Sequence, residues 1–443
     1  MASNSSLPRA DADRLHADWR YLCRTIGARV AGGPGERRAA DYLERRFTAI
    51  GLQVDREAFP CRYLVESHSA VAGRVGKRWQ SVDSLRMMNS GSTPAGRPVE
   101  GELVWMDFPE SQHRLSPGSL RGKILVLFGQ LPGDTRSFRK LLAARPAAVL
   151  PIDDREPFAW PIQNALLPDW VKRFGTVPAA AIAYQTAWQW RAQGVSRARV
   201  AIQTRYETRA SGNVVATLPG SAPEEPAILF GAHHDTPIGL VGADDNASGV
   251  VSLLELARIL AAAPQRRRTY IFASFGTEEQ LSVGAAAYAL RHRRELSRIG
   301  LMVNFDSISS HLGHNQLFHS GQKGLGEFFK TQLGRRGYDL ELNAALNPFS
   351  DHFPFTAYGV PGVWFYRSNV RGSIRWQHHS GRNHDSLANA SAAVIGGMLD
   401  ALAPAILALG QARTRAWPFP RKLPAPLAAQ TAQFARKWYG FKV

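Results

Sequence analysis

Residues 227–260 read AILFGAHHDTPIGLVGADDNASGVVSLLELARIL, and this stretch contains the pattern that decides the fold. The run Ala227–Phe230 is wholly apolar, which is typical of a strand buried on both faces. A helix is predicted from Val250 to Leu260, because one face of that helix collects the apolar side chains of Val250, Leu253, Leu254, Ala257 and Leu260. A buried strand followed by an amphipathic helix indicates an α/β fold.

The same alternation continues along the chain. Apolar runs that predict further strands are Val214–Leu218, Tyr270–Phe275, Leu301–Phe305 and Val363–Tyr366, and helical segments separate them. Strands that alternate with helices form a sheet covered by helices on both faces. We therefore expect a three-layer α/β domain whose mixed sheet is largely parallel.

The chain has 443 residues, more than one compact core usually needs, so several parts are expected. We expect an N-terminal helical segment at 1–65 that belongs to the main domain, and an inserted β-rich lobe at 66–205. The main α/β domain then covers 206–410, and a basic extension covers 411–443. In the first segment, Gly35 to Ile50 is predicted to be an amphipathic helix, with Gly51 suited to a left-handed cap.

The inserted lobe has a different pattern of predicted elements from the rest of the chain. Short strands are predicted at Glu102–Met106, Ile124–Phe128, Ala147–Pro151 and Ala180–Ala183, and helices at Arg136–Ala144 and Gln185–Ala192. None of its residues form a catalytic cluster. We interpret it as a lid or substrate-shaping lobe.

Composition limits the class of protein. Hydrophobic residues make up 44% and charged residues 20%, as in ordinary globular proteins, and we see no apolar run that approaches bilayer length. The segment Met1–Arg20 is polar and lacks a signal-like region, so a cytoplasmic location is expected, with secretion open if the N-terminus is processed. The net charge is +18, but no nucleic-acid motif accompanies it, so we expect a basic surface and no nucleic-acid partner.

The two cysteines, Cys23 and Cys61, exclude a disulfide framework and a cysteine-rich zinc module. We expect two buried free thiols, with a single bridge as the alternative.

The extension after Gly410 holds seven Lys/Arg and no Asp/Glu. A short helix is predicted over Leu427–Trp438, which either docks on its own protein or touches an anionic surface.

Histidines and carboxylates follow successive predicted strands. His233 comes just past one strand, Asp245 lies where a loop enters a helix, and Glu278–Glu279 follow the next strand. Asp306 ends the strand after that, and a histidine cluster follows later in the chain. Because ligands bind at the carboxyl ends of strands in open α/β sheets, we expect these side chains to converge.

Nitrogen and oxygen donors without thiolates suit zinc in a catalytic role, with cobalt or manganese as possible substitutes. Two histidines and three carboxylates are too many for one open tetrahedral site, but they suit two ions if one carboxylate bridges them. The adjacent residues Glu278 and Glu279 suit two different roles. One of them binds metal, and the other takes a proton from the bound water.

Several motifs together carry a resemblance to a known family. They are Gly231–Thr236, Gly242–Gly249, Thr277–Glu279, Asn304–Asp306, and Ser350–Phe355 with Gly359–Pro361. With them the chain resembles the co-catalytic zinc aminopeptidases of the bacterial leucyl aminopeptidase type, which include aminopeptidase S and carboxypeptidase Q-like exopeptidases, and more distantly glutaminyl cyclases. The resemblance covers about 210–405, and a weaker sequence match is present at Arg29–Glu36. It makes 206–410 the zinc peptidase catalytic domain, and the middle lobe resembles the protease-associated insert of several members.

The resemblance implies a role for each site residue. His233 and Asp306 would bind one Zn²⁺, while Glu279 and a C-terminal histidine would bind the other. Asp245 would bridge the two ions and form a cis peptide bond to Asn246, with Asp244 as the alternative bridging residue. The catalytic residues would be Glu278, as general base, and Asp235, which would orient His233. Asp351 and His352 resemble a pair that shapes the pocket, although a purely structural role is open for His352.

The chain departs from the family at the last ligand. Family members read histidine, a small hydroxyl residue, two further residues and aspartate, whereas the segment from His379 to Asp385 is two residues longer. His379 is the predicted ligand because Ser380 follows it. His378 and His384 remain alternatives.

These observations predict a metal-dependent exopeptidase, an aminopeptidase with two zinc ions per chain that acts on peptides. A dipeptidase or carboxypeptidase of the same family is the nearest alternative. Two others are a glutaminyl cyclase-like transferase with a single zinc and a non-catalytic binding module, against which the intact Glu278–Glu279 pair argues. Side-chain specificity and oligomeric state are not read from the sequence.

Overall fold

A computed structural model describes residues 7–442, except 108, 130, 132–133, 156, 163, 264, 370–383 and 414–416. The chain divides into two compact units. Unit 1 comprises the described residues of 1–63, 208–374 and 385–443, and unit 2 those of 64–207 and 375–384. Each unit has its own hydrophobic clusters.

Unit 1 is built on a mixed sheet in the order β13-β12-β14-β11-β9-β10-β8. Its strands are β8 (Arg197–Leu218), β9 (Ala227–His233), β10 (Tyr270–Phe275), β11 (Ile299–Phe305), β12 (His314–Phe318), β13 (Glu341–Asn343) and β14 (Gly362–Ser368). The central strands β10, β9, β11 and β14 are parallel, while β8 and β12 run antiparallel to their central neighbours. All five strands predicted for the main domain are present.

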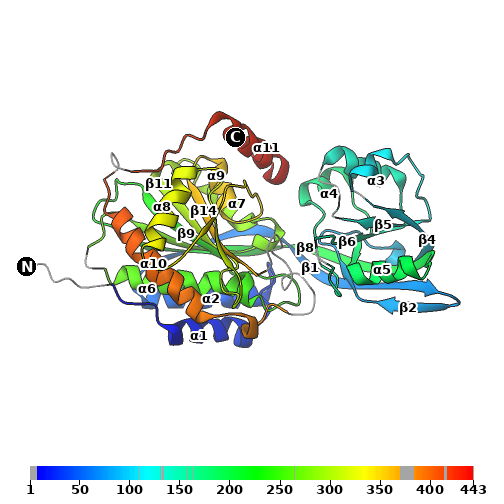
Figure 1. Ribbon diagram of the computed structural model, residues 1–443, viewed down its shortest axis with the longest axis horizontal. Coiled ribbons are helices and arrows are strands. Elements are labelled where there is room, and N and C mark those ends of the chain that lie inside the picture. The colour runs from blue at the N-terminus through cyan, green and yellow to red at the C-terminus, as the bar shows by residue number, and fades with distance from the viewer. Residues whose placement is uncertain are drawn as a thin grey trace, which may run out of the picture. The chain divides into compact units, whose positions relative to one another are not determined.

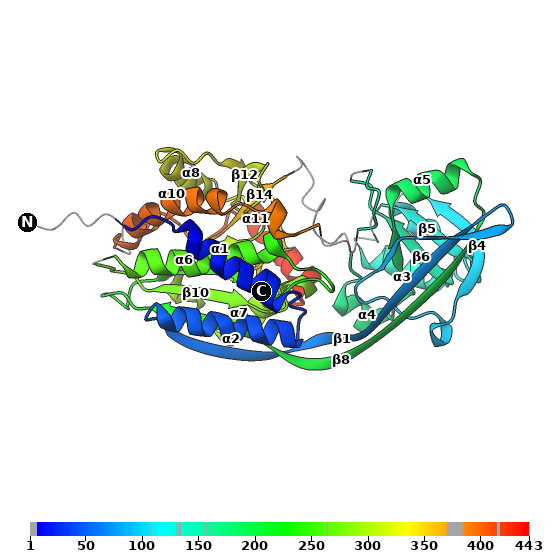
Figure 2. The ribbon, with the colours of Figure 1, turned by 90° about the horizontal axis from the view of Figure 1, so that it is seen from below.

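Helices cover both faces of this sheet (Figures 1 and 2). Ile228 and Phe230 of β9 face a cluster with α1 (Ala12–Arg20), α2 (Pro34–Ala49), α6 (Gly249–Ala261), α8 (Lys323–Gly334) and α10 (Ala392–Gly410). The intervening Leu229 faces the opposite cluster, with α7 (Val283–Arg291) and α9 (His352–Ala357). Neighbouring strand residues point to opposite faces, so a strand buried on both sides must be wholly apolar. The expected three-layer α/β fold is confirmed.

The N-terminal helices follow the sequence signals. Helix α2 begins with Pro34 in its first turn, buries Leu43 and Phe47, and is followed by Gly51 at φ +89°. The predicted helix and its left-handed glycine are therefore confirmed. The short helical segments are η1 (Tyr21–Ile26), η4 (Ala243–Ser248), η5 (Glu278–Gln280), η6 (Leu296–Arg298) and η7 (Leu387–Asn389).

The C-terminal extension docks on its own unit. It forms α11 (Ala425–Phe434) and continues as η9 (Ala435–Tyr439). Phe434 and Tyr439 pack against Phe353 of α9, with ring centroids 6.5 and 5.5 Å away. Of the two alternatives for this segment, the described residues take the docked one.

Unit 2 is rich in strands, as predicted, and helices pack against its sheet. Its sheet runs β8-β4-β5-β6-β7-β3. The elements that it adds are β1 (Gln53–Val75), β2 (Arg78–Val82), β3 (Ser84–Arg86), η2 (Pro94–Gly96), β4 (Val99–Met106), η3 (Pro109–Arg114), β5 (Ile124–Phe128), α3 (Thr135–Ala144), β6 (Ala148–Ile152), α4 (Pro168–Phe174), β7 (Ala180–Ile182) and α5 (Tyr184–Ala192). One cluster packs Trp190 of α5 against the sheet, and another packs Phe138 and Trp170 of α3 and α4.

Two very long strands take part in both units. β1 has 23 residues and β8 has 22. Of β8, only Val214–Leu218 was predicted, because its polar middle segment, 203–212, offers no periodic apolar pattern.

One apolar helix corrects the sequence-based expectation. In the described part of the chain, α10 alone is long and apolar enough to cross a membrane by length and composition, so the expectation that no apolar run approaches bilayer length was wrong. Yet 56% of its most apolar window is buried in the protein. Ile395, Leu399 and Leu402 belong to the main core cluster, as expected for a core helix.

Both cysteines are free and buried, as expected.

Candidate metal centre

The predicted site residues gather at the carboxyl edge of the unit 1 sheet. His233 is the last residue of β9, which lies between β10 and β11, and it is fully buried. Asp245 lies in η4, where the expected cis peptide bond joins it to Asn246. Glu278 and Glu279 begin η5 directly after β10.

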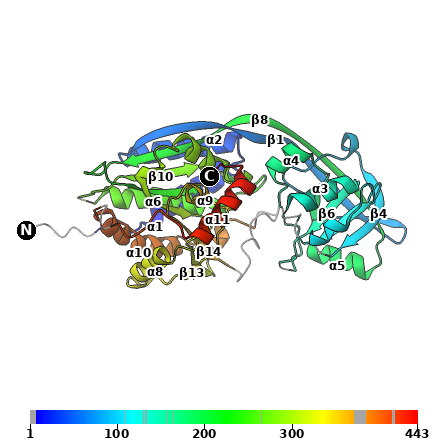
Figure 3. The same cartoon turned by 90° about the horizontal axis from the view of Figure 1, so that it is seen from above.

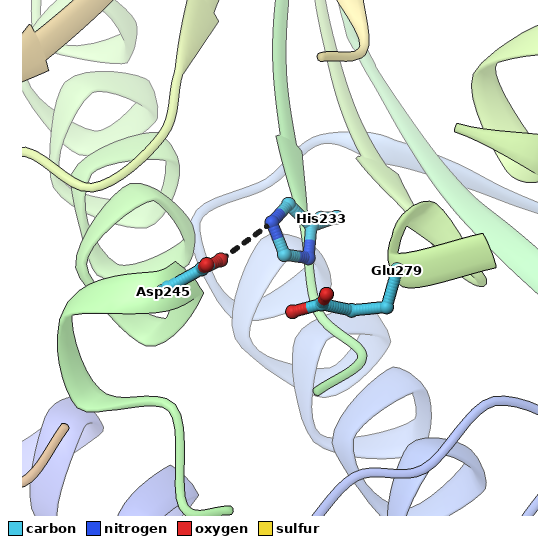
Figure 4. A group of neighbouring side chains, drawn as sticks. All are labelled: His233, Asp245 and Glu279. Atoms are coloured by element: carbon cyan, nitrogen blue, oxygen red, sulfur yellow. Dashed lines mark ion pairs between the residues drawn. The ribbon is translucent and has the colours of Figure 1, made fainter. Parts of the chain in front are cut away.

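The side chains of three residues converge closely enough to share a cation. His233, Asp245 and Glu279 each offer a ligand atom, and these atoms all lie within 4.8 Å of one another. Figure 4 shows both carboxylates directed toward the imidazole ring, with Asp245 Oδ1 3.1 Å from His233 Nε2. Asp306 Oδ1 and Glu278 Oε2 lie 3.7 and 3.8 Å from the same nitrogen.

The electrostatics of this cluster fit a bound cation. Burial raises the pKa of Glu278 and of Glu279 well above the ordinary value for glutamate. Burial lowers the pKa of His233, but the carboxylates of Glu278, Asp235, Asp245 and Asp306 outweigh it and raise that pKa well above its ordinary value. Buried carboxylates in such proximity repel one another unless a positive charge lies among them.

The donor atoms indicate which cation fits. Neither ring nitrogen of His233 forms a hydrogen bond with any residue that the structure describes. One imidazole surrounded by carboxylate oxygens, without a thiolate, is a donor set suited to zinc. These residues therefore fit the predicted metal.

Asp235 contacts two parts of the centre at once. Its Oδ1 lies 3.5 Å from His233 Nδ1, on the side of the ring away from Asp245. The same carboxylate accepts hydrogen bonds from the backbone N–H groups of Glu278 at 2.8 Å and Glu279 at 3.2 Å. Asp235 thus links the histidine to the turn that carries both glutamates.

The two neighbouring aspartates of η4 are distinguished by their contacts. Asp244 Oδ1 accepts hydrogen bonds from Ser309 N at 2.8 Å and Ser309 Oγ at 2.6 Å, so its carboxylate is engaged away from the cluster. Asp245 is the aspartate at His233. Asp385 accepts hydrogen bonds from the backbone N–H groups of Asp244 and Asp245, at 2.6 and 2.8 Å, which fixes this segment.

Asp306 is held by two serines, one of which accepts a hydrogen bond from an asparagine. Ser307 Oγ donates to its Oδ1 at 3.1 Å, and Ser350 Oγ donates to its Oδ2 at 2.9 Å. Asn304 Nδ2 in turn donates to Ser350 Oγ at 2.8 Å. The motifs that contain Asn304 and Ser350 therefore support one carboxylate.

The last predicted ligand cannot be placed in the same way. His378 and His379 lie outside the described residues. His384 is described, and its ring packs edge-on against Trp160 of unit 2, with centroids 4.5 Å apart. The choice among the three histidines stays a prediction.

Arg29 is a structural element of the centre that sequence reasoning did not single out. Its guanidinium is fully buried and donates hydrogen bonds to four backbone carbonyls, those of Gly27, His234, Val241 and Gly242. It thereby joins the N-terminal segment to the loop that follows His233. A lone arginine in a glycine-rich stretch gives no signal for this role beyond its place in the weaker motif Arg29–Glu36.

The pair Asp351–His352 lies close to the centre but contributes differently. Burial raises the pKa of Asp351 well above its ordinary value. His352 is fully buried, and its ring centroid lies 6.0 Å from that of Trp364. Neither of its ring nitrogens hydrogen-bonds a described residue.

Residues 213–405 match the sequence pattern of peptidase family M28. This segment is therefore similar to the domains of M28 peptidases. It contains every described residue that is predicted to bind metal. This similarity also accounts for the resemblance to zinc aminopeptidases, which rested on motifs within the same range.

Curated relatives agree with this assignment. Leupeptin-inactivating enzyme 1 of Streptomyces exfoliatus is 28% identical over 213 residues, which is 45% of this chain and 48% of that protein. A probable zinc metalloprotease of Pyrenophora tritici-repentis is 29% identical over 38% of this chain and 49% of its own length. The chain therefore spans about half of the length of these two relatives. Aminopeptidase YwaD of Bacillus subtilis is 24% identical over 78% of this chain and 73% of its own length.

Solved structures share the fold along almost the whole chain. An aminopeptidase from Aneurinibacillus sp. strain AM-1 superposes with a TM-score of 0.73 at 22% identity, covering 94% of this chain and 98% of that one. A peptidase M28 precursor from Shewanella amazonensis SB2B gives a TM-score of 0.74 at 18% identity, covering 93% and 95%. The arrangement of the M28-like domain together with unit 2 along the chain therefore has structural precedent.

Proposed function

We propose that the protein is a metal-dependent exopeptidase, specifically an aminopeptidase that removes N-terminal residues from peptides with the help of two zinc ions. The observation that carries the proposal is the convergence of His233, Asp245 and Glu279 within 4.8 Å, at the carboxyl edge of the unit 1 sheet. The names of the aminopeptidases among the similar proteins support the same choice.

The geometry supports part of the proposed ligand set, and the resemblance supplies the rest. His233 and Asp306 would hold one zinc, Glu279 and His379 the other, and Asp245 would bridge them. Zinc bound there would polarise the scissile carbonyl group and lower the pKa of a water molecule. Asp235 keeps the imidazole of His233 oriented toward the metals through its contact with Nδ1.

Glu278 is proposed as the general base. Ser282 Oγ donates a hydrogen bond to its Oε1 at 3.0 Å, while Oε2 lies 3.8 Å from His233 Nε2. The serine thus holds one carboxylate oxygen, and the other faces the metal centre. From that position Glu278 accepts the proton of the attacking water and passes it to the leaving amine.

A substrate panel tests the proposed specificity. Aminoacyl-nitroanilides, N-blocked peptides and free dipeptides are incubated with the protein, with and without a chelator. Chelator-sensitive release of N-terminal residues from unblocked substrates is expected. Cleavage of N-blocked peptides at the C-terminus would identify a carboxypeptidase, and cleavage of dipeptides alone a dipeptidase.

A metal count separates the remaining alternatives. Elemental analysis of the active protein is expected to give two zinc ions per chain. One zinc together with formation of pyroglutamate would favour the glutaminyl cyclase-like transferase. Bound zinc without turnover of any substrate class would favour a binding module.

Two further parts of the proposal concern the whole chain. We propose that unit 2 is the counterpart of the protease-associated insert in the family that the chain resembles.

We also propose a cytoplasmic location, which fractionation of the native cells followed by immunoblotting tests directly.

A further inference from the structure

The two glutamates of the metal centre lie on a strained turn. Thr277, Leu281 and Ser282 flank η5 and have φ values of +60°, +80° and +45°. Residues other than glycine are destabilised in this left-handed region unless their surroundings hold them there. Contacts from outside the turn must therefore keep Glu278 and Glu279 in place.

Two buried side chains hold the backbone of this turn. Asp235 accepts hydrogen bonds from the backbone N–H groups of both glutamates. Asn213 of β8 is fully buried, and its Oδ1 accepts a hydrogen bond from Gly276 N at 3.2 Å. Thr277 lies between these two positions, and its side chain has a further partner in the N-terminal part of the chain.

That part of the chain contributes α2, which packs on the strand before the turn. The ring centroid of Phe47 in α2 lies 6.2 Å from that of Phe272 in β10, and Figures 2 and 3 both show this helix beside that strand. Glu36 lies in the first turn of α2 and is only 2% exposed. No step of the proposed reaction uses this carboxylate.

The carboxylate of Glu36 joins three segments by hydrogen bonds. Its Oε1 accepts from Thr277 Oγ1 at 3.4 Å and from Ser211 Oγ of β8 at 2.7 Å. Its Oε2 accepts from Gly32 N at 2.7 Å. The N-terminal segment, β8 and the turn with the two glutamates therefore share one buried acceptor.

The turn also packs directly against this carboxylate. A Cβ atom at Gly276 would lie 2.8 Å from Glu36 Oε1 and 2.5 Å from Ser211 Oγ, closer than side chains approach. The position before Thr277 therefore requires glycine. Because Thr277 directly precedes Glu278, its conformation fixes the direction in which the Glu278 side chain leaves the backbone.

We propose that Glu36 is a positioning residue of the peptidase site, which holds Thr277 in its left-handed conformation and thereby directs Glu278 toward the metal centre. The inference rests on the proposed function, because that function makes Glu278 the general base. It also gives the N-terminal segment a role, because Glu36 lies outside residues 213–405, which match the M28 pattern.

Thr277→Val tests this role with the smallest change. Valine keeps the branched shape of threonine and removes only the hydroxyl group, so Glu36 keeps its hydrogen bonds with Ser211 and Gly32. We expect kcat to fall about fivefold, because one buried hydrogen bond to a carboxylate is lost. KM and zinc content should stay at the wild-type values, because Asp235 still holds the backbone of both glutamates.

Glu36→Gln tests the other partner of the same contact. An amide has one acceptor oxygen, so it cannot accept hydrogen bonds from Gly32 N and from both hydroxyl groups through two oxygens. We expect kcat to fall about fivefold and the melting temperature to fall as well, because a buried donor loses its acceptor. In the Thr277→Val background the contact is already absent. Adding Glu36→Gln there should lower kcat by less than about twofold, although the melting temperature should still fall.

A matched control is the same substitution at another buried glutamate. Glu255 of α6 is 4% exposed, accepts a hydrogen bond from Asp11 N at 2.7 Å, and pairs with Arg258 at 2.6 Å. Glu255→Gln should lower the melting temperature and leave kcat at the wild-type value. A role in stability alone would make Glu36→Gln behave in the same way.

The outcomes separate this inference from the proposed function. If the wild-type protein shows no chelator-sensitive peptidase activity, the proposed function fails, and the inference fails with it. If the wild type is active and Thr277→Val has the same kcat, only the inference is overturned. Loss of zinc in Thr277→Val also overturns it, as does an equal fall of kcat in Glu255→Gln. A full fivefold effect of Glu36→Gln that persists in the Thr277→Val background overturns it too.

Discussion

Two adjacent glutamates at the end of β10 reach the metal centre in different ways. Glu279 belongs to the group of ligand atoms around His233, whereas Glu278 has one oxygen held by Ser282. We expect Glu278→Gln to retain both zinc ions but to lose at least about 100-fold in kcat, because an amide cannot accept the proton of the attacking water. Steady-state kinetics and elemental analysis on the same sample test this prediction.

The neighbouring substitution serves as the matched control. Glu279→Gln replaces a predicted ligand and should lose zinc as well as activity, so the two variants differ in metal content. Wild-type turnover in Glu278→Gln would show that the base is wrongly assigned. Equal zinc loss in both variants would show that the glutamates are not divided between metal binding and proton transfer.

The two aspartates of η4 give a second residue-scale prediction. Asp245→Ala should bind less than one zinc per chain, because the proposed bridging carboxylate is removed. Asp244→Asn should keep its zinc, since the Asp244 carboxylate bonds Ser309 and not the cluster. Its effect should instead be a lower melting temperature. Stoichiometric zinc in Asp245→Ala, by elemental analysis, would argue against the bridge.

The convergence of most ligands could be predicted at this scale because His233, Glu279 and Asp306 lie at or just after the ends of strands. Strand order then brings His233, Glu279 and Asp306 to one edge without any knowledge of side-chain packing. Contacts between distant segments could not be predicted in this way. Arg29 and Asp385 bind backbone groups of the loops around His233 and Asp245, and such partners carry no local sequence signal.

At the scale of elements, the buried strands were predictable and the exposed ones were not. β9 and β11 are apolar along their central residues because both faces are covered by helices. β1 and β8 are long strands that change from one environment to another along their length. No single period describes them, so their extent is fixed by pairing with neighbours and not by their own composition.

The start of α9 gives an element-scale prediction about acid stability. Burial lowers the pKa of His352 to about 3, so this side chain stays neutral in the folded protein at pH 5. The unfolded chain binds a proton there below about pH 6.5, and the folded protein therefore loses stability as the pH falls from 6.5 toward 3. In the variant His352→Leu, this loss of stability at low pH is absent. Between pH 7 and pH 5 the variant should lose about 2 kcal/mol less stability than the wild type.

Urea unfolding at the two pH values measures this difference. His16→Leu on the exposed side of α1 is the control, and it should follow the wild-type dependence on pH. The leucine introduced by His352→Leu would keep an apolar contact with Trp364, so folding at pH 7 should be preserved. Identical pH dependence in His352→Leu and the wild type would mean that His352 is protonated in the folded protein.

At the scale of the whole molecule, the two units have separate hydrophobic cores. The clusters of unit 1 and those of unit 2 share no residue, although β1 and β8 pass through both units. Units with their own cores tend to unfold in separate steps. Two thermal transitions are therefore expected by scanning calorimetry.

Zinc should stabilise only one of these transitions. His233, Asp245, Glu279 and Asp306 all belong to unit 1, and a ligand stabilises only the part whose folded state binds it. Removing tightly bound zinc with a chelator should lower the unit 1 transition by roughly 10 °C and leave the other in place.

The two transitions can be assigned with one core variant. Leu150 is fully buried in a unit 2 cluster, and Leu150→Ala should cost about 2–5 kcal/mol in that unit alone. The variant should thus lower the transition that the chelator leaves unchanged. A single transition that moves with both treatments would mean that the shared strands β1 and β8 make the units unfold together. In that case zinc bound by unit 1 would stabilise the whole chain.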